Sequence, residues 1–154
     1  MITAERNTIS ILMADDDEDD RIMSRDALRE ARLTNDLHFV EDGEELMDYL
    51  RCRGKYAGLN NAPRPDLILL DLNMPKKDGR EALREIKGDD DLRQIPIVVL
   101  TTSKSEEDIL QTYDLGVNSF ITKPVLFASL VDIMNAIARY WFETVELPRK
   151  SDGK

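Results

Sequence analysis

One short apolar run that ends in a single carboxylate constrains this chain more than any other feature. Residues 67–70 read Leu-Ile-Leu-Leu, Asp71 follows them directly, and Pro75 closes the segment. An apolar run of this length between breakers is typical of a strand buried on both faces, and such strands belong to parallel sheets covered by helices. Ligands bind where the carboxyl ends of those strands emerge, and an ionised carboxylate there needs a compensating cation. Asp71 is therefore a candidate site residue.

Further apolar runs alternate with segments in which apolar residues recur at three- and four-residue spacing. The sequence predicts strands at 9–14, 37–41, 67–70, 95–100 and 119–122. It predicts helices at 21–31, 44–53, 80–87 and 125–142, and one more that begins after Ser103 or Ser105 and has Gly116 as its left-handed cap. Five strands alternating with five helices predict a single α/β domain over residues 1–154, built on a doubly wound parallel sheet.

Composition excludes several classes of protein. Hydrophobic residues make up 42% of the chain and charged residues 34%, which indicates a globular protein. The formal net charge of -10 argues against nucleic acid as a direct partner. Cys52 is the single cysteine, so no intramolecular disulfide forms. The first ten residues lack the apolar core of a signal peptide, and no apolar stretch is long enough to span a bilayer, so we expect a cytoplasmic protein without membrane contact.

Polar residues follow the predicted strands at the points where the strands end. Asp15 and Asp16 follow the first strand, Asp71 the third, Thr101 the fourth and Lys123 the fifth. The carboxyl ends of parallel strands meet at one edge of the sheet, so these side chains can converge. Three carboxylates repel one another unless they share a divalent cation, and oxygen ligands favour a hard ion such as Mg²⁺. A carboxylate beside such an ion can attack phosphorus, with Lys123 and Thr101 binding phosphoryl oxygens.

At these positions the chain resembles the receiver domain of two-component response regulators. The resemblance covers residues 9 to about 142, and Thr102 is a small departure, because a smaller residue is commonest there. The matching positions are the acidic pair Asp15 and Asp16, the phosphoacceptor Asp71, Pro75 and Gly79 after it, the switch residues Thr101 and Phe120, and the Lys123-Pro124 signature.

The resemblance implies a flavodoxin-like fold with strand order 2-1-3-4-5 and a phosphoryl group received on Asp71 from a sensor histidine kinase. It implies that Asp16 binds Mg²⁺ directly, Asp15 binds it through water, and Asn73 contributes its backbone carbonyl. Phosphorylation would draw Thr101 inward and change a protein–protein surface. Such a protein is not an enzyme in the usual sense, because it catalyses only its own phosphotransfer and dephosphorylation.

Several residues have structural explanations as well. Asp17 to Asp20 could simply favour a helix N-terminus through the dipole. Thr101 could be only a strand-terminal hydroxyl, and Phe120 could be a core residue. His38 and Cys52 are expected to be structural.

The last predicted helix has more apolar surface than one core-facing stripe requires. Its two stripes lead to the aromatic run 140–142, and a mostly polar tail, 143–154, follows. We expect this helix and tail to form a homodimer interface, unless the tail folds back over its own helix. The aromatic end and the residues after it also resemble receivers that partner bacterial phytochrome kinases. The two stripes contain Leu126, Leu130, Ile133, Ile137 and Trp141, and Phe127, Val131, Met134, Ala138 and Phe142.

Two other functions use related chemistry. A haloacid-dehalogenase-type phosphohydrolase also has an aspartate nucleophile and Mg²⁺, but it normally carries a second aspartate where this chain has Asn73. A flavodoxin-like module would bind FMN, yet the loop after the first strand is acidic where a phosphate cradle needs free N–H groups.

Overall fold

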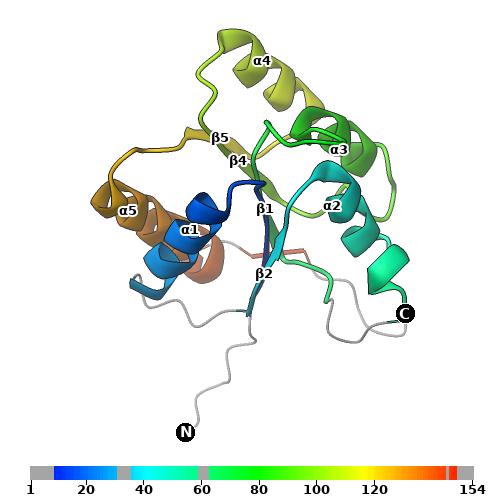
Figure 1. Ribbon diagram of the computed structural model, residues 1–154, viewed down its shortest axis with the longest axis horizontal. Helices are drawn as coiled ribbons and strands as arrows, with labels where there is room; N and C mark the ends of the chain where they lie inside the picture. Colours follow the sequence, from blue (N-terminus) through cyan, green and yellow to red (C-terminus); the bar gives the residue numbers. More distant parts are fainter. Residues whose placement is uncertain (1–8, 31–35, 59–62, 145, 149–154) are drawn as a thin grey trace, which may run out of the picture.

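The computed structural model describes residues 9–30, 36–58, 63–144 and 146–148. Expectations for residues 1–8, for Ala31, for the loop residues 59–62 and for 145 and 149–154 of the tail lie outside the described residues. A five-stranded parallel sheet has the order β2-β1-β3-β4-β5, which confirms the predicted doubly wound fold (Figure 1). The strands are β1 (Ser10–Ala14), β2 (Asp36–Val40), β3 (Leu67–Leu70), β4 (Ile97–Thr101) and β5 (Ser119–Thr122).

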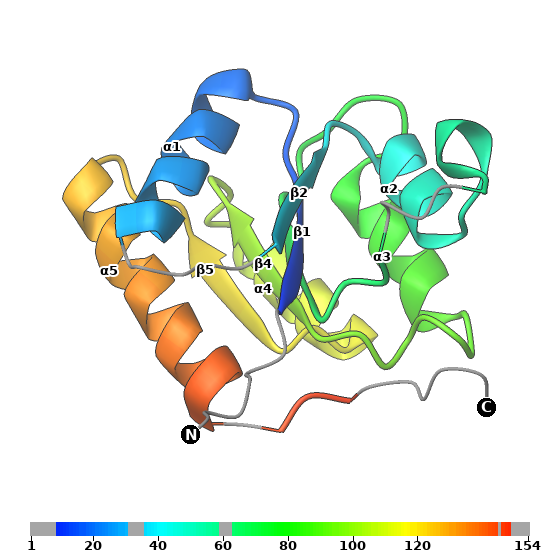
Figure 2. The same ribbon diagram turned by 90° about the horizontal axis from the view of Figure 1, so that it is seen from below.

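Helices cover both faces of the sheet. The helices are α1 (Glu18–Glu30), α2 (Gly43–Leu50), α3 (Gly79–Lys87), α4 (Glu106–Leu115) and α5 (Phe127–Ala138). A short 3-10 helix, η1 (Gly54–Tyr56), follows α2, and a π-helical segment, η2 (Arg139–Thr144), follows α5. Figure 2 shows α1 and α5 on one side of the sheet and α2 and α3 on the other. No helix in the described part of the chain is long and apolar enough to cross a membrane.

Alternating side chains of the strands build two cores. Leu12 and Ile68 point into the core under α2 and α3, whereas Ile11 and Leu69 point into the core under α1 and α5. Both faces of β1, β3 and β4 are therefore buried, and this is why their sequences read as continuous apolar runs.

Helix boundaries follow their capping residues. Ser105 accepts a hydrogen bond from the N–H of Asp108 and begins α4, and Gly116 ends that helix with a φ of 105°, as the sequence predicts. Asp78 begins α3 with a reciprocal capping box to Glu81.

Several predicted boundaries are wrong by a few residues, among them the end of α2, which lies at Leu50 rather than at 53. The apolar periodicity starts at residue 21, and the acidic residues 18–20 form the first turn of α1 before it. β4 begins at Ile97 rather than at 95, since Pro96 has no N–H to donate to the ladder. α5 is regular only from Phe127 to Ala138, and the turns from 139 to 144 widen into a π-helix.

Candidate functional site

The site residues lie at the last hydrogen bonds of the sheet. The N–H of Asp71 donates to the carbonyl of Ala14 at 3.0 Å, and the N–H of Asp15 donates to the carbonyl of Val40 at 3.0 Å. The N–H of Lys123 donates to the carbonyl of Thr101 at 2.7 Å. The backbone N–H of each of these three residues is therefore still hydrogen-bonded to the neighbouring strand, and this fixes the position of its Cα.

Three carboxylates converge at this edge. Oxygens of Asp15, Asp16 and Asp71 all lie within 4.8 Å of one another. Asp15 is fully buried and Asp71 nearly so, whereas Asp16 is exposed. Burial raises the pKa of Asp15 above its ordinary value, and the hydrogen bond from Lys123 opposes that rise. An all-oxygen cluster that is open on one side suits a hard divalent cation.

The ammonium of Lys123 compensates the negative charge of the nearby carboxylates. Its Nζ donates to Oδ2 of Asp15 at 2.5 Å, to Oδ2 of Asp20 at 2.8 Å and to Oδ2 of Asp71 at 3.2 Å. Burial alone would lower the pKa of Lys123, but the hydrogen bonds to Asp15 and Asp20 raise it well above its ordinary value. Lys123 is therefore held as a cation among the carboxylates.

Asp20 was not predicted to belong to the site. Its position in the first turn of α1 indicated only a favourable interaction with the helix dipole. Asp17 performs that function, because its Oδ1 accepts the backbone N–H groups of Asp19 and Asp20 at 2.9 and 3.3 Å. The acidic run offers no signal that separates Asp20 from its neighbours, because all of its members suit the N-terminus of a helix.

The other oxygen of Asp71 faces Thr101. The hydroxyl of Thr101 donates to Oδ1 of Asp71 at 2.6 Å, and the N–H of Asn73 donates to the same oxygen at 3.2 Å. Thr101 is fully buried, so its hydroxyl serves Asp71 rather than solvent. The two oxygens of Asp71 therefore have different partners, a hydroxyl and a backbone N–H on one and an ammonium on the other.

The loop after Asp71 is fixed by Gly79. A Cβ at this position would lie 2.3 Å from the carbonyl oxygen of Asp71 and 2.7 Å from Cα of Leu72. The N–H of Gly79 donates to the carbonyl of Leu72 at 2.9 Å. The start of α3 is thus packed directly against the backbone of the strand end.

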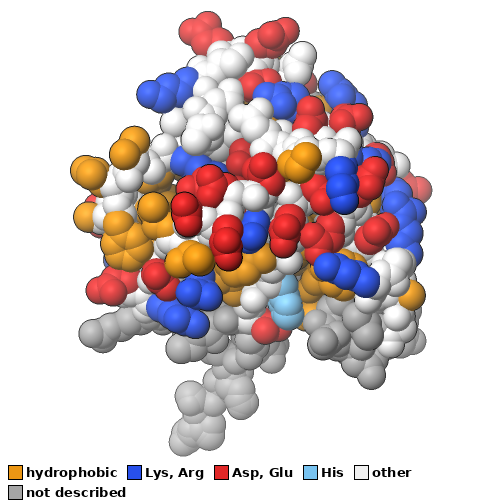
Figure 3. All heavy atoms as spheres, in the orientation of Figure 1, with side chains coloured by type: hydrophobic (Ala, Val, Ile, Leu, Met, Phe, Trp, Pro, Cys, Tyr) orange, Lys and Arg blue, Asp and Glu red, His pale blue; other side chains and the backbone are white. Residues whose placement is uncertain are grey.

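The remaining predicted residues lie around this centre. Phe120 is half-buried against the core under α2 and α3, so its side chain both contacts the core and remains partly exposed to solvent. Thr102 is exposed and, with Asp20, Lys123 and Pro124, lines a hollow of about 270 Å³ between α1 and α5. Figure 3 shows acidic side chains gathered over the middle of this face, around the connection from β1 to α1.

His38 and Cys52, which the sequence predicts to be structural residues, lie outside this centre. His38 lies 3.1 Å from Asp36 and its ring is 5.9 Å from that of Tyr49, which supports a structural role. Cys52 is exposed with a φ of 53°, at the end of α2, and makes no disulfide.

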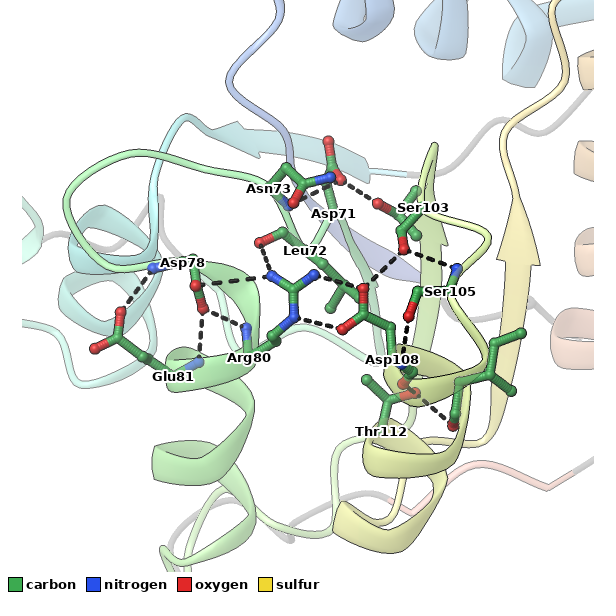
Figure 4. A network of polar contacts seen from close by, with 12 residues as sticks. Asp71, Leu72, Asn73, Asp78, Arg80, Glu81, Ser103, Ser105, Asp108 and Thr112 are labelled. Carbon is green, nitrogen blue, oxygen red and sulfur yellow. Dashed lines mark hydrogen bonds and ion pairs between the residues drawn. The ribbon is translucent and has the colours of Figure 1, made fainter.

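A second polar network lies beside Asp71 and was not predicted. Arg80 and Asp108 form a bidentate ion pair between the first turns of α3 and α4, and Ser103 joins it (Figure 4). The two residues are 28 positions apart, and no local pattern relates them.

Residues 11–135 match the response regulator receiver domain family. Response regulator Rcp1 of Synechocystis is 44% identical over 138 residues, which span 90% of this chain and 92% of that protein. The probable methanogenesis regulatory protein FilR2 of Methanothrix harundinacea is 37% identical over 85% of this chain and 82% of its own length.

Solved structures agree with this relationship. The phosphorylated cyanobacterial phytochrome response regulator RcpA has a TM-score of 0.85 and 46% identity, over 92% of this chain and 99% of its own. The Mn²⁺-bound form of Rcp1 has a TM-score of 0.83 and 42% identity, over 92% of this chain and 99% of its own. From the match over residues 11–135 and these relatives, the chain belongs to the response regulator receiver domain family.

Proposed function

We propose that this chain is a response regulator that receives a phosphoryl group from a sensor histidine kinase on Asp71. The observation that supports this proposal most is that the two oxygens of the Asp71 carboxylate have different partners. Oδ1 of Asp71 faces the Thr101 hydroxyl, Oδ2 faces the Lys123 ammonium, and two further carboxylates, Asp15 and Asp16, lie within ion-sharing distance.

The donor set fits Mg²⁺, with Asp15, Asp16 and Asp71 as carboxylate ligands and Asn73 offering its backbone carbonyl. When bound, the ion neutralises charge on the phosphoryl oxygens. A carboxylate oxygen of Asp71 attacks phosphorus, the bond from phosphorus to the donor imidazole breaks, and the imidazole leaves with the electron pair. Lys123, already cationic in the site, binds one phosphoryl oxygen, and the Thr101 hydroxyl donates to another.

Phosphorylation adds charge and acceptor oxygens where Thr101 and Lys123 now contact Asp71. Thr101 ends β4 and Lys123 directly follows its partner strand β5. Phe120 lies in β5, and its backbone nitrogen donates to the Tyr113 hydroxyl of α4 at 3.3 Å. We therefore assign the switch to Thr101 and Phe120 and the output to the surface of α4, β5 and α5.

The kinase we propose is of the phytochrome type. Several solved relatives are described as phytochrome or bacteriophytochrome response regulators, among them RcpA and a regulator, AtBRR, with 39% identity and a TM-score of 0.71. Exposed apolar side chains flank the hollow beside Lys123, with Val125 91% and Leu126 67% exposed, and they offer a contact for the donor domain.

We also propose a homodimer through α5 and the tail. Leu126, Phe127 and Tyr140 are exposed, whereas Trp141 and Phe142 pack partly against the core under α1 and α5. Sedimentation at micromolar concentration should show a dimer that Tyr140→Ser weakens. A monomer in both the unphosphorylated and phosphorylated protein would exclude this assembly.

The direct test is incubation with Mg²⁺ and acetyl phosphate, followed by intact mass measurement. We expect one base-labile phosphoryl group, lost in Asp71→Asn and kept in Asp132→Asn, a matched substitution at an exposed acid of α5. A label that persists in Asp71→Asn would place the acceptor elsewhere. Steady phosphate release from a generic phosphomonoester would instead favour a phosphohydrolase.

A further inference from the structure

The ion pair between Arg80 and Asp108 is built more precisely than a surface contact. Nε of Arg80 lies 2.8 Å from Oδ1 of Asp108, and Nη2 lies 2.6 Å from Oδ2, so the two planar groups meet fork to fork (Figure 4). The side chains are only 24% and 14% exposed. Parallel charge-assisted hydrogen bonds of this kind are stronger and more geometrically specific than single ones.

The pair joins the two connections that leave the phosphoacceptor edge. Nη1 of Arg80 lies 3.4 Å from the carbonyl of Leu72, the residue after Asp71. Ser103, two residues after Thr101, donates its hydroxyl to Oδ2 of Asp108 at 2.7 Å. Asp108 therefore ties the first turn of α4 to the backbone beside the acceptor and to the loop beside the hydroxyl that faces it.

Helix capping does not require this arrangement. The side chain of Ser105 already caps α4 by accepting the N–H of Asp108 at 3.2 Å. Glu106 and Glu107, in the same turn and exposed, supply the negative charge that suits a helix N-terminus. The carboxylate of Asp108 is thus directed sideways, toward α3 and the acceptor strand, for a reason other than the stability of α4 alone.

We propose that Arg80 and Asp108 form a latch that holds α4 in its unphosphorylated position and that phosphorylation of Asp71 opens. The proposal rests on the proposed function and adds to the route through Thr101 a second one, through a positioning residue, Arg80. It would make α4 the element that is released when the acceptor is modified.

Two physical effects point toward opening. The Arg80 guanidinium already lies beside the acceptor, with its Nη1 3.4 Å from the carbonyl of Leu72, and the hydrogen bonds to Asp108 raise the pKa of Arg80 against the opposing effect of burial. Acyl phosphate formation replaces the unit negative charge of the Asp71 carboxylate by a phosphoryl group of about -1.5 to -2, so the negative charge at the acceptor grows by up to about one unit and competes with Asp108 for that cation. An inward movement of Thr101 would also draw Ser103 away from Asp108, because the two lie in one short segment.

Hydrogen exchange of the α4 amides, residues 109–115, tests the latch, with beryllofluoride and Mg²⁺ as the phosphoryl analogue. We expect the analogue to speed exchange in the natural chain about tenfold, the order of loss of one charge-assisted contact. Asp108→Asn should exchange as fast without the analogue and gain nothing when it is added. Glu107→Gln removes an equal charge from the same turn and should behave as the natural chain does.

Linkage provides a second readout that a merely structural pair would not move. If the analogue opens the latch, then Asp108→Asn should bind beryllofluoride more tightly by about the same factor, because coupling is reciprocal. Arg80→Met should speed α4 exchange as Asp108→Asn does, and the double variant should add nothing further, since both remove one interaction.

The outcomes separate the two proposals. If acetyl phosphate labels Asp71 but α4 exchange in the natural chain is unchanged or slowed by beryllofluoride, the latch is wrong and the receiver function stands. If Asp108→Asn responds to the analogue as fully as Glu107→Gln does, the latch is also wrong. If Asp71 is never labelled, the proposed function and the latch both fail.

Discussion

Replacement of Lys123 by methionine should leave the carboxylates of the site without a compensating cation, so that the stability of the fold depends on a bound divalent metal. Nζ of Lys123 contacts the carboxylates of Asp15, Asp20 and Asp71 at 2.5, 2.8 and 3.2 Å, and no other ion pair to these three carboxylates is found among the described residues. Its side chain is 9% exposed, and those of Asp15 and Asp71 are 0% and 8% exposed. Methionine keeps most of the apolar stem, so the loss is mainly that of the charge.

The magnitude follows from the burial. Removal of one partner from a buried ion pair costs about 3–5 kcal/mol, because it leaves an uncompensated charge. Asp16 opens the cluster to solvent, so we take the lower end, about 3 kcal/mol of unfolding free energy. For a chain of this size that corresponds to a melting temperature lower by roughly 6–12 °C. A divalent cation at 100 times its dissociation constant for the variant stabilises the variant by about 2.7 kcal/mol. The natural chain gains less at the same concentration, because the Lys123 ammonium already compensates the carboxylates and weakens cation binding.

The assay is urea unfolding in EDTA and again in saturating Mg²⁺, with Lys104→Met as the control at an exposed lysine. We expect the control to change the unfolding free energy by less than about 0.5 kcal/mol. Asp15→Asn in the Lys123→Met background should recover part of the loss, since it removes the most buried of the unpaired acids. A loss below about 1 kcal/mol in EDTA, or an equal loss with and without Mg²⁺, would refute the reasoning.

Three further outcomes follow from the same contacts. Thr101→Val should lower the unfolding free energy by about 1.5 kcal/mol, because Asp71 loses its 2.6 Å hydroxyl donor; an unchanged urea midpoint would contradict this. Gly79→Ala should destabilise the protein by more than about 2 kcal/mol and reduce acetyl phosphate labelling, since its Cβ would meet the carbonyl of Asp71 at 2.3 Å; full labelling at normal stability would show that the loop adapts. Burial raises the pKa of Tyr49 to about 12, and its hydroxyl donates to the carbonyl of Pro63. The folded state therefore keeps this proton longer than the unfolded state, whose pKa is about 10, and the stability it contributes is complete below pH 10 and declines from about pH 10 to 12. Tyr49→Phe should lose less stability over that interval, and equal slopes for the two proteins would contradict the assignment.

The sheet and its acidic edge could be predicted because one-dimensional patterns determine them. The run at 67–70 has to be buried on both faces, and Asp71 has to emerge where that burial ends. The same argument applied to β1 and β5 places Asp15 and Lys123 beside it, and the structure does bring them together. Convergence here depends only on strand direction and order.

Contacts between helices could not be predicted in this way. The pairing of Arg80 with Asp108 depends on how far α3 and α4 are rotated about their own axes, and on which rotamer each long side chain adopts. Asp20 reaches Lys123 because Asp17, rather than Asp20, serves the helix N-terminus, and the acidic run alone does not distinguish them. The widened turns at 139–144 follow apolar stripes that fit an ordinary helix equally well.

The N–H groups of Asp15, Asp71 and Lys123 are the final rungs of three adjoining strand pairs. The spacing of the strands in the sheet, rather than the conformation of the loops that follow them, therefore sets the distances between the backbones of these residues. To move the backbones of Asp15 and Asp71 apart, the protein has to break the pairing of β1 with β3, two strands that are buried on both faces. The backbone positions of Asp15 and Asp71 should thus survive changes in most loop sequences, whereas the positions of Asp16 and Asn73 depend on the loops that carry them.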